Sequence, residues 1–135
     1  MPASDLEIDL AAELSAEAEP SHQQLTVYVP DRDRDGNEIG DQRRWVLEAA
    51  ALLARIGGGV TIMPPVEGGW FDPERDHIVW ERPVLVYTFV RPDAFEATLA
   101  ELRSFLHRLG REARQGEVAV EFAGCFYRMR EFEAP

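Results

Sequence analysis

Apolar residues recur along the chain with two different periods, and the order of these periods predicts an α+β fold. Apolar positions at helical spacing mark two helices, from Trp45 to Ile56 and from Phe95 to Leu109. Alternation with a period of two marks strands at 25–29, 60–63, 77–90, 118–122 and 126–130. The order βαββαβ with an extra C-terminal hairpin strand predicts a ferredoxin-like two-layer sandwich, in which two helices cover one face of an antiparallel sheet.

Turn and capping residues set the expected boundaries of these elements. Asp41 stands where it can cap the first helix, and Asp93 and Glu96 have capping-box spacing at the start of the second. Three successive glycines, 57–59, end the first helix. Pro83 marks a bend or an edge position inside the long strand, because proline cannot donate to a strand ladder.

The strand predicted at 77–90 is apolar on both of its faces. One alternating set contains Val84, Val86 and Val90, and the other contains Leu85, Tyr87 and Phe89. Two helices can cover only one face of a sheet, so one set needs cover from elsewhere in the chain or from another molecule. The pattern does not determine which set faces the helices.

The first 24 residues predict an acidic tail outside the domain formed by 25–135. Residues 1–20 contain six Asp and Glu and no Lys or Arg, whereas the whole chain has a net charge of -11. Leu6, Leu10 and Leu14 recur every four residues, and Ser4 and Glu7 have capping-box spacing. The tail is therefore expected to be either disordered or a short amphipathic helix.

Length and composition indicate one domain that is not built for membranes or nucleic acids. A chain of 135 residues with 45% hydrophobic residues can bury one core. Its negative charge opposes direct binding to DNA or RNA. The single cysteine, Cys125, has no partner for an internal disulfide, and no apolar stretch approaches membrane-spanning length. We expect a cytoplasmic protein that needs no membrane.

Short segments of the chain resemble a known family. They are Gly57-Gly58-Gly59-Val60-Thr61, Gly69-Trp70, Glu81-Arg82-Pro83 and Gln115-Gly116-Glu117-Val118-Ala119-Val120-Glu121. Together they resemble uncharacterised small bacterial proteins with a ferredoxin-like core, over roughly 25–132. The resemblance implies a fold and no assigned activity or catalytic residue.

No metal or cofactor is expected from the residues that could ligate one. Asp31-Arg32-Asp33-Arg34-Asp35-Gly36 copies the first half of a calcium loop, but Gln42 occupies the twelfth position, where a bidentate Glu is required. His22, His77 and His107 lack the spacing of a zinc site. Cys125 has only Arg128 and Arg130 as basic neighbours in sequence, which favours an unreactive thiol.

The pattern favours a small binding or assembly module that works through the open face of its sheet, an accessory protein in a bacterial complex. Its partner would be a second copy or another protein, with large aromatic side chains as anchors. The expected binding face comprises Tyr28, Trp70, Glu81, Tyr87, Phe89 and Glu121.

Two alternatives stay open at this point. One is a small dimeric α+β-barrel enzyme, with Glu81 or Glu121 as a general base and His77 or Tyr28 as a proton donor. The other is an acidic protein that mimics a nucleic acid.

Overall fold

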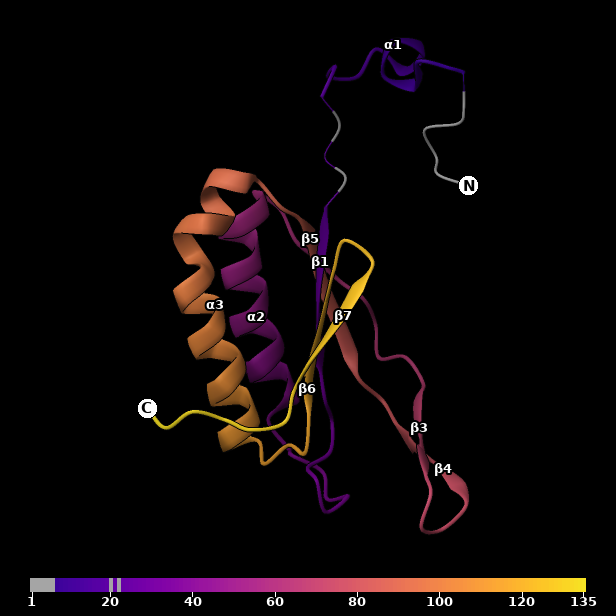
Figure 1. The fold of residues 1–135 in the computed structure, drawn as a ribbon, viewed down its shortest axis with the longest axis vertical. Helices are drawn as coiled ribbons and strands as arrows, with labels where there is room; N and C mark the ends of the chain where they lie inside the picture. Colours follow the sequence, from indigo (N-terminus) through magenta and orange to yellow (C-terminus); the bar gives the residue numbers. More distant parts are fainter. Residues whose placement is uncertain (1–6, 20, 22) are drawn as a thin grey trace.

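The computed structural model describes residues 7–19, 21 and 23–135, which form helices on one side of an antiparallel sheet (Figure 1). This confirms the α+β prediction. Along the chain the elements are α1 (Leu10–Leu14), β1 (Gln24–Val29), α2 (Gln42–Gly57), β2 (Thr61–Ile62), β3 (Gly68–Asp72), β4 (His77–Glu81), β5 (Val84–Phe89), α3 (Pro92–Glu112), β6 (Val118–Phe122) and β7 (Cys125–Met129).

Five strands form the main sheet in the order β2-β5-β1-β6-β7, with every neighbouring pair antiparallel. β1 lies at the centre, where Val27 pairs with Val86 of β5 and with Val120 of β6. A turn at Ala123 and Gly124 joins β6 to β7, and both residues have positive φ values, 51° and 85°. This left-handed geometry gives the tight two-residue connection of a hairpin.

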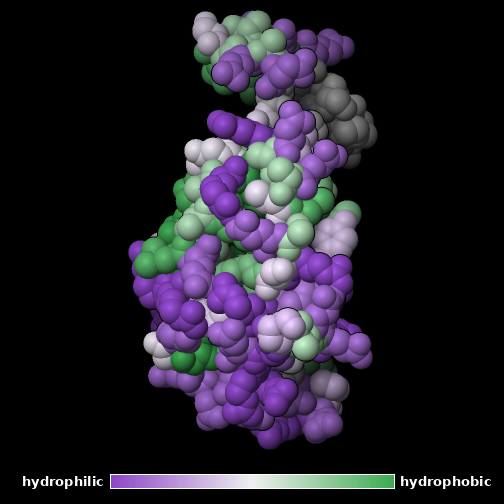
Figure 2. Space-filling model, turned by 90° about the vertical axis from the view of Figure 1, so that its left-hand side faces the viewer, coloured by the Kyte–Doolittle hydropathy of each residue, from purple (hydrophilic) through white to green (hydrophobic). Residues whose placement is uncertain are grey.

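The core lies between the sheet and the helices α2 and α3, which run side by side over one sheet face (Figure 1). Trp45, Leu53 and Ile56 of α2 and Leu109 of α3 are almost completely buried against Val27 and its neighbours. The outer surfaces of both helices are largely hydrophilic, most evenly toward the end away from α1 (Figure 2). Among the described residues, no helix combines the length and apolar character needed to cross a membrane.

The strand predicted at 77–90 is in fact two strands in two different sheets. β4 pairs only with β3 in a separate hairpin, whereas β5 enters the main sheet between β1 and β2. Arg82 and Pro83 separate them, because proline lacks the N–H that a continuing strand would donate. The β3–β4 hairpin consequently extends beyond the end of the main sheet (Figure 1).

Both predicted helix starts differ in detail from the structure. Asp41 precedes α2, but its carboxylate binds the Arg44 guanidinium at 2.9 Å instead of accepting a capping hydrogen bond. α3 begins at Pro92, with Arg91 at the N-cap, so Asp93 lies within the first turn. Proline is suited to this position because the first helical N–H has no partner in any case.

A short helix, α1, is present in the acidic segment. Asp9 caps it, accepting a hydrogen bond from the backbone N–H of Ala12 at 3.2 Å, and none of its residues is buried. Ser4 and Leu6 lie outside the described residues. The division into a tail of 1–24 and a domain of 25–135 stays a prediction.

Gly57 permits α2 to end in close contact with β5. A Cβ at this position would overlap the Thr88 hydroxyl and lie 2.5 Å from the Phe89 carbonyl oxygen. Thr88 itself donates a hydrogen bond to the Gly59 carbonyl at 2.6 Å. α2 and β5 therefore contact each other at a point where there is no room for a side chain.

We expect Gly57→Ala to lower the free energy of unfolding by about 1–3 kcal/mol, the usual cost of overpacking. Gly59→Ala is the matched control, since a Cβ there meets nothing within 4 Å. Chemical denaturation of both variants measures the difference. Equal stability of the two would show that the contact between α2 and β5 relaxes freely.

Candidate functional site

The strand register assigns each side chain of the main sheet to one of its two faces. Leu25, Val27 and Val29 point into the core, so Thr26 and Tyr28 lie on the face without helices, here called the open face. The residues directly opposite share that face: Leu85, Tyr87 and Phe89 on β5, Ala119 and Glu121 on β6, and Phe126 and Arg128 on β7. Val84 and Val86 are buried on the helix side, which settles the face that the sequence left undecided.

Tyr28 and Glu121 form a hydrogen-bonded pair on the open face. The Tyr28 hydroxyl donates to Oε1 of Glu121 at 2.9 Å, although the two residues are 93 positions apart in the chain. Burial raises the pKa of Tyr28, and the hydrogen bond to Glu121 and the negative charge of that carboxylate raise it further. Tyr28 is therefore a neutral donor near pH 7, and among the described residues no hydrogen bond reaches the other Glu121 carboxylate oxygen.

Aromatic and charged side chains of β7 and β6 flank this pair. The Phe126 ring stands edge-on to the Tyr28 ring, with centroids 5.8 Å apart. The Arg128 guanidinium lies 4.8 Å from the Phe126 ring centre and its Nε lies 3.8 Å from Oε1 of Glu117. An anionic carboxylate beside aromatic rings is an arrangement that attracts organic cations.

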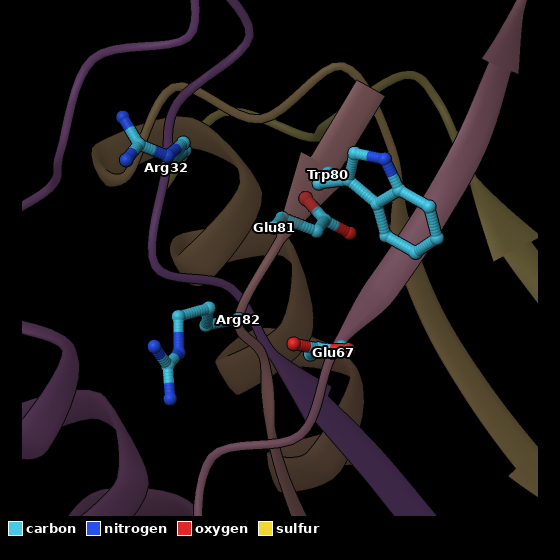
Figure 3. Close-up of a pocket in the computed structure, with 5 residues that line it drawn as sticks. All are labelled: Arg32, Glu67, Trp80, Glu81 and Arg82. Atoms are coloured by element: carbon cyan, nitrogen blue, oxygen red, sulfur yellow. The ribbon is translucent and has the colours of Figure 1, made fainter. Parts of the chain in front are cut away.

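A cavity of about 450 Å³ opens at the base of the β3–β4 hairpin and is shown in Figure 3. This volume lies within the range of small-molecule sites. Its lining combines two arginines, two glutamates and an indole: Arg32, Arg82, Glu67, Glu81 and Trp80.

The walls of the cavity are held by hydrogen bonds between side chains and the backbone. The Arg82 N–H donates to the Asp31 carboxylate at 3.0 Å, and the Gln42 side chain donates to the Arg82 carbonyl at 3.1 Å and to the Val29 carbonyl at 3.2 Å. The Gln115 side chain donates to the Arg32 carbonyl at 2.8 Å. The cavity therefore has a preorganised rim tied to β1, α2 and the segment before β6.

Glu81 links the cavity electrostatically to the main sheet. Burial raises its pKa above the ordinary value of 4.5, and the negative charges of Asp31 and Glu117 raise it further. Glu117 directly precedes β6, the strand that carries Glu121. Pro83 and Val84, which follow Arg82, lead directly to Leu85 opposite Tyr28.

The structure brings together four of the six residues predicted for the binding face. Tyr28, Tyr87, Phe89 and Glu121 share the open face through the register. Glu81 and Trp70 instead belong to the β3–β4 hairpin, where Glu81 lines the cavity and Trp70 is 51% exposed. The role of all six in binding stays a prediction.

The other residues considered from sequence lie away from the Tyr28–Glu121 pair. His77 stands at the turn end of β4, with Nδ1 3.3 Å from the Arg75 carbonyl oxygen, so the structure does not support it as a proton donor there. His107 accepts a hydrogen bond from the Glu133 N–H at 2.9 Å, and Cys125 is exposed and free. His22 lies outside the described residues.

The aspartate-rich loop is organised by its own backbone. The Asp33 carboxylate accepts hydrogen bonds from the N–H groups of Asp35 at 2.9 Å and Asn37 at 3.0 Å, which is the geometry of an Asx turn. Over the part of the chain that the structure describes, no three His, Cys, Asp or Glu side chains gather into a metal-binding group.

Sequence reasoning missed Arg32, Glu67, Trp80 and Arg82 of the cavity and Phe126 and Arg128 beside the pair. The β6–β7 hairpin was predicted, and its register alone would have placed Phe126 opposite Glu121. No local pattern signals the cavity, because its lining comes from three separate segments.

No protein-family model and no curated protein sequence matches the chain. Its structure is similar to that of a phage SAM lyase in complex with S-methyl-5'-thioadenosine, with a TM-score of 0.55 and 17% sequence identity. It is also similar to a phage SAM lyase in the apo state, with a TM-score of 0.50 and 14% identity. Each match covers 84% of this chain and 92% of the other. At this identity, the likeness establishes the α+β fold and does not transfer chemistry.

These matches correct the functional expectation drawn from sequence. The sequence favours a binding or assembly module over an enzyme. That expectation is wrong, since the solved structures that share the fold are those of an enzyme. The sequence misled because it contains no contiguous catalytic motif, and an apolar open face was taken for an interface.

Glu81→Gln provides a test of the electrostatics of the cavity. The raised pKa means that the folded protein holds the Glu81 proton more tightly than the unfolded chain, so the ionised carboxylate costs stability above the folded-state pKa. We expect Glu81→Gln to melt above wild type at pH 7, with a gain that shrinks as the pH falls through the folded-state pKa toward 4.5. Glu74→Gln, in the exposed hairpin turn, should show no such trend. A wild-type advantage at pH 7 would contradict the cause assigned to the shift.

Proposed function

We propose that this chain is an enzyme that binds S-adenosylmethionine, or a closely related sulfonium nucleoside, on the open face of its sheet and cleaves a carbon–sulfur bond in it. The observation that carries the proposal is the Tyr28–Glu121 pair, with its 2.9 Å hydrogen bond and the edge-on Phe126 ring beside it. The likeness in fold to a phage SAM lyase supports the choice of substrate.

The chemistry of the pair suits a sulfonium ion. A sulfonium is a soft cation without hydrogen-bond donors, so a protein recognises it through carboxylates and aromatic rings. Glu121 supplies the charge, while Tyr28 and Phe126 supply the rings. The net charge of -11 additionally favours the approach of cationic ligands.

Cleavage between sulfur and the amino-acid chain would release S-methyl-5'-thioadenosine. One oxygen of the substrate's own α-carboxylate attacks the carbon bound to sulfur, so a C–O bond forms as the C–S bond breaks and the amino-acid part leaves as a lactone. The electron pair of the broken bond moves onto sulfur, which leaves as a neutral thioether. The positive charge at sulfur disappears, so a partly desolvated site favours the reaction over the charged substrate in water. Within this proposal, Tyr28 holds the Glu121 carboxylate in one orientation toward the substrate.

The finer topology belongs to the same proposal. The strand order β2-β5-β1-β6, with α2 and α3 as the helices that connect β1 to β2 and β5 to β6, supports a ferredoxin-like core. In this description, the β3–β4 hairpin is an insertion between the second and third core strands, and β7 is an added edge strand.

The direct test is to incubate the purified protein with S-adenosylmethionine and to measure S-methyl-5'-thioadenosine by liquid chromatography and mass spectrometry. We expect Glu121→Gln and Tyr28→Phe each to lower kcat/KM at least about tenfold, which corresponds to about 1.4 kcal/mol. Matched controls are Glu96→Gln, exposed on α3, and Tyr127→Phe, exposed on β7 and outside the pair.

Both controls should retain wild-type turnover. Absence of the thioether product above an enzyme-free blank would overturn the proposed reaction. Full activity of Glu121→Gln would remove the assigned role of the pair.

Self-association through the open face is a separate prediction, drawn from the sequence. Leu85, Tyr87 and Phe89 point away from the helices, and leaving such side chains in water forgoes about 1.5–3 kcal/mol each. Tyr87→Asp should therefore dissociate an assembly observed by light scattering and leave the protein folded. Val86→Asp should unfold it, because Val86 is fully buried. A wild-type chain that stays monomeric at high micromolar concentration would show that no such contact forms.

A further inference from the structure

The cavity at the hairpin base presents charges of both signs to the same space. Figure 3 shows the Arg82 and Arg32 guanidinium groups on one side and the Glu67 and Glu81 carboxylates on the other, with the Trp80 ring beside Glu81. A ligand that carries one negative and one positive group would match this division.

The charges in the cavity are largely left without partners by the protein itself. Among the described residues, no carboxylate lies within 4.0 Å of the Arg82 guanidinium, and no Lys, Arg or His nitrogen lies within 4.0 Å of the Glu67 or Glu81 carboxylates. Within the described part of the chain, the Arg32 guanidinium makes a 3.9 Å contact with Glu38 and a 3.0 Å hydrogen bond to the Gly36 carbonyl, and no other polar side-chain contact. Elsewhere in the described chain the same side-chain types pair closely, as Arg114 does with Asp35 at 2.9 Å.

The unpaired Glu81 carboxylate destabilises the folded protein when it is ionised. Its side chain is half-buried next to the negative charges of Asp31 and Glu117. Arg128 and Arg130 pair with Glu117, but no described Arg or His nitrogen lies within 4.0 Å of the Glu81 carboxylate. A bound ammonium group would relieve this repulsion, and a carboxylate on the same ligand would satisfy Arg82.

The Trp80 ring lies over Gly69 and forms one wall of the cavity. Gly69 lies directly opposite in the hairpin, and a Cβ there would be 3.1 Å from Cε3 and Cζ3 of Trp80. The indole is nevertheless 62% exposed, so one part of it is free to contact a ligand. A ring face beside a carboxylate is favourable for an ammonium group.

We propose that this cavity binds the α-amino-acid end of the substrate, with the ligand carboxylate on Arg82 and Arg32 and the ammonium group between Glu81 and Glu67. The assignment rests on the proposed function, because S-adenosylmethionine carries such a zwitterionic end. S-methyl-5'-thioadenosine lacks it. The cavity lies beyond the end of β5, where Arg82 precedes Leu85, the partner of Tyr28, by three residues.

The test compares three ligands by isothermal titration calorimetry: S-adenosylmethionine, methionine and S-methyl-5'-thioadenosine. We expect Arg82→Gln and Glu81→Gln each to weaken S-adenosylmethionine and methionine about tenfold, as for the loss of one charge-assisted contact. Affinity for S-methyl-5'-thioadenosine should change less than about twofold. Arg75→Gln and Glu74→Gln, at the far end of the hairpin, are the matched controls and should bind like wild type.

Tryptophan fluorescence gives an independent readout of position. Methionine should change the emission of wild type and of Trp70→Phe, in which the altered side chain lies on the opposite hairpin face from Trp80. It should not change the emission of Trp80→Phe. Thermal melts of every variant confirm that each is folded before titration.

The outcomes separate this proposal from the proposed function. Methionine binding that depends on Arg82, in a protein that does not cleave S-adenosylmethionine, supports the cavity and overturns the reaction. If the protein cleaves S-adenosylmethionine but Arg82→Gln and Glu81→Gln bind it as tightly as wild type, the ligand assigned to the cavity is wrong. Equal weakening of all three ligands would also overturn it, because the effect would then not concern the amino-acid end.

Discussion

The packing of α2 and α3 against one face of the main sheet is the interaction on which the rest of the structure depends. Leu53, Ile56 and Leu109 are completely buried there with Val27 and Val86, and each such side chain contributes about 1.5–3 kcal/mol. Both amphipathic helices, α2 and α3, cover this face of the sheet, so neither of them covers the opposite face. Side chains that project from the other pleat of the same strands are thereby assembled into a surface that ligands can reach. The location of the candidate site is thus a consequence of how the core is covered.

Charge placement gives this surface its chemical character. The carboxylates of Glu81, Glu117 and Glu121 lie along the open face and its end. Among the residues that the structure describes, Glu117 is the one of the three with arginine partners, Arg128 and Arg130. Aromatic side chains replace cations as the neighbours of the other two: Tyr28 and Phe126 near Glu121, and Trp80 near Glu81. Carboxylates without cationic partners, partly withdrawn from water, are stabilised most by a cationic ligand. This argument does not use the likeness in fold to the phage SAM lyase, and the sulfonium substrate that we propose is such a cation.

The functional expectation failed because the residues of the candidate site come from distant segments of the chain. Tyr28 and Glu121 are 93 positions apart, and neither belongs to a motif with its own spacing. Their meeting depends on β1 pairing with β6, a long-range contact that a local pattern does not encode. In the absence of a motif, apolar residues on both faces of the 77–90 segment indicated an interface. The segment is not one strand: 77–81 pairs in a separate hairpin, and 84–89 enters the main sheet. The apolar residues of 77–81 therefore do not belong to either face of that sheet.

The sequence by itself determined the α+β class, the two long helices and the β6–β7 hairpin, because periodicity, glycine and proline act locally and report on the nearest few residues. It also identified Tyr28 and Glu121 as members of one face, since alternation along a strand follows from the pleat. Only the tertiary structure decided that Leu85, Tyr87 and Phe89 point away from the helices, because both sets of that strand are equally apolar. Only the tertiary structure assembled Arg32, Glu67 and Arg82 around one cavity, because the hydrogen bonds that hold its rim join Asp31, Gln42 and Gln115 across the whole length of the chain.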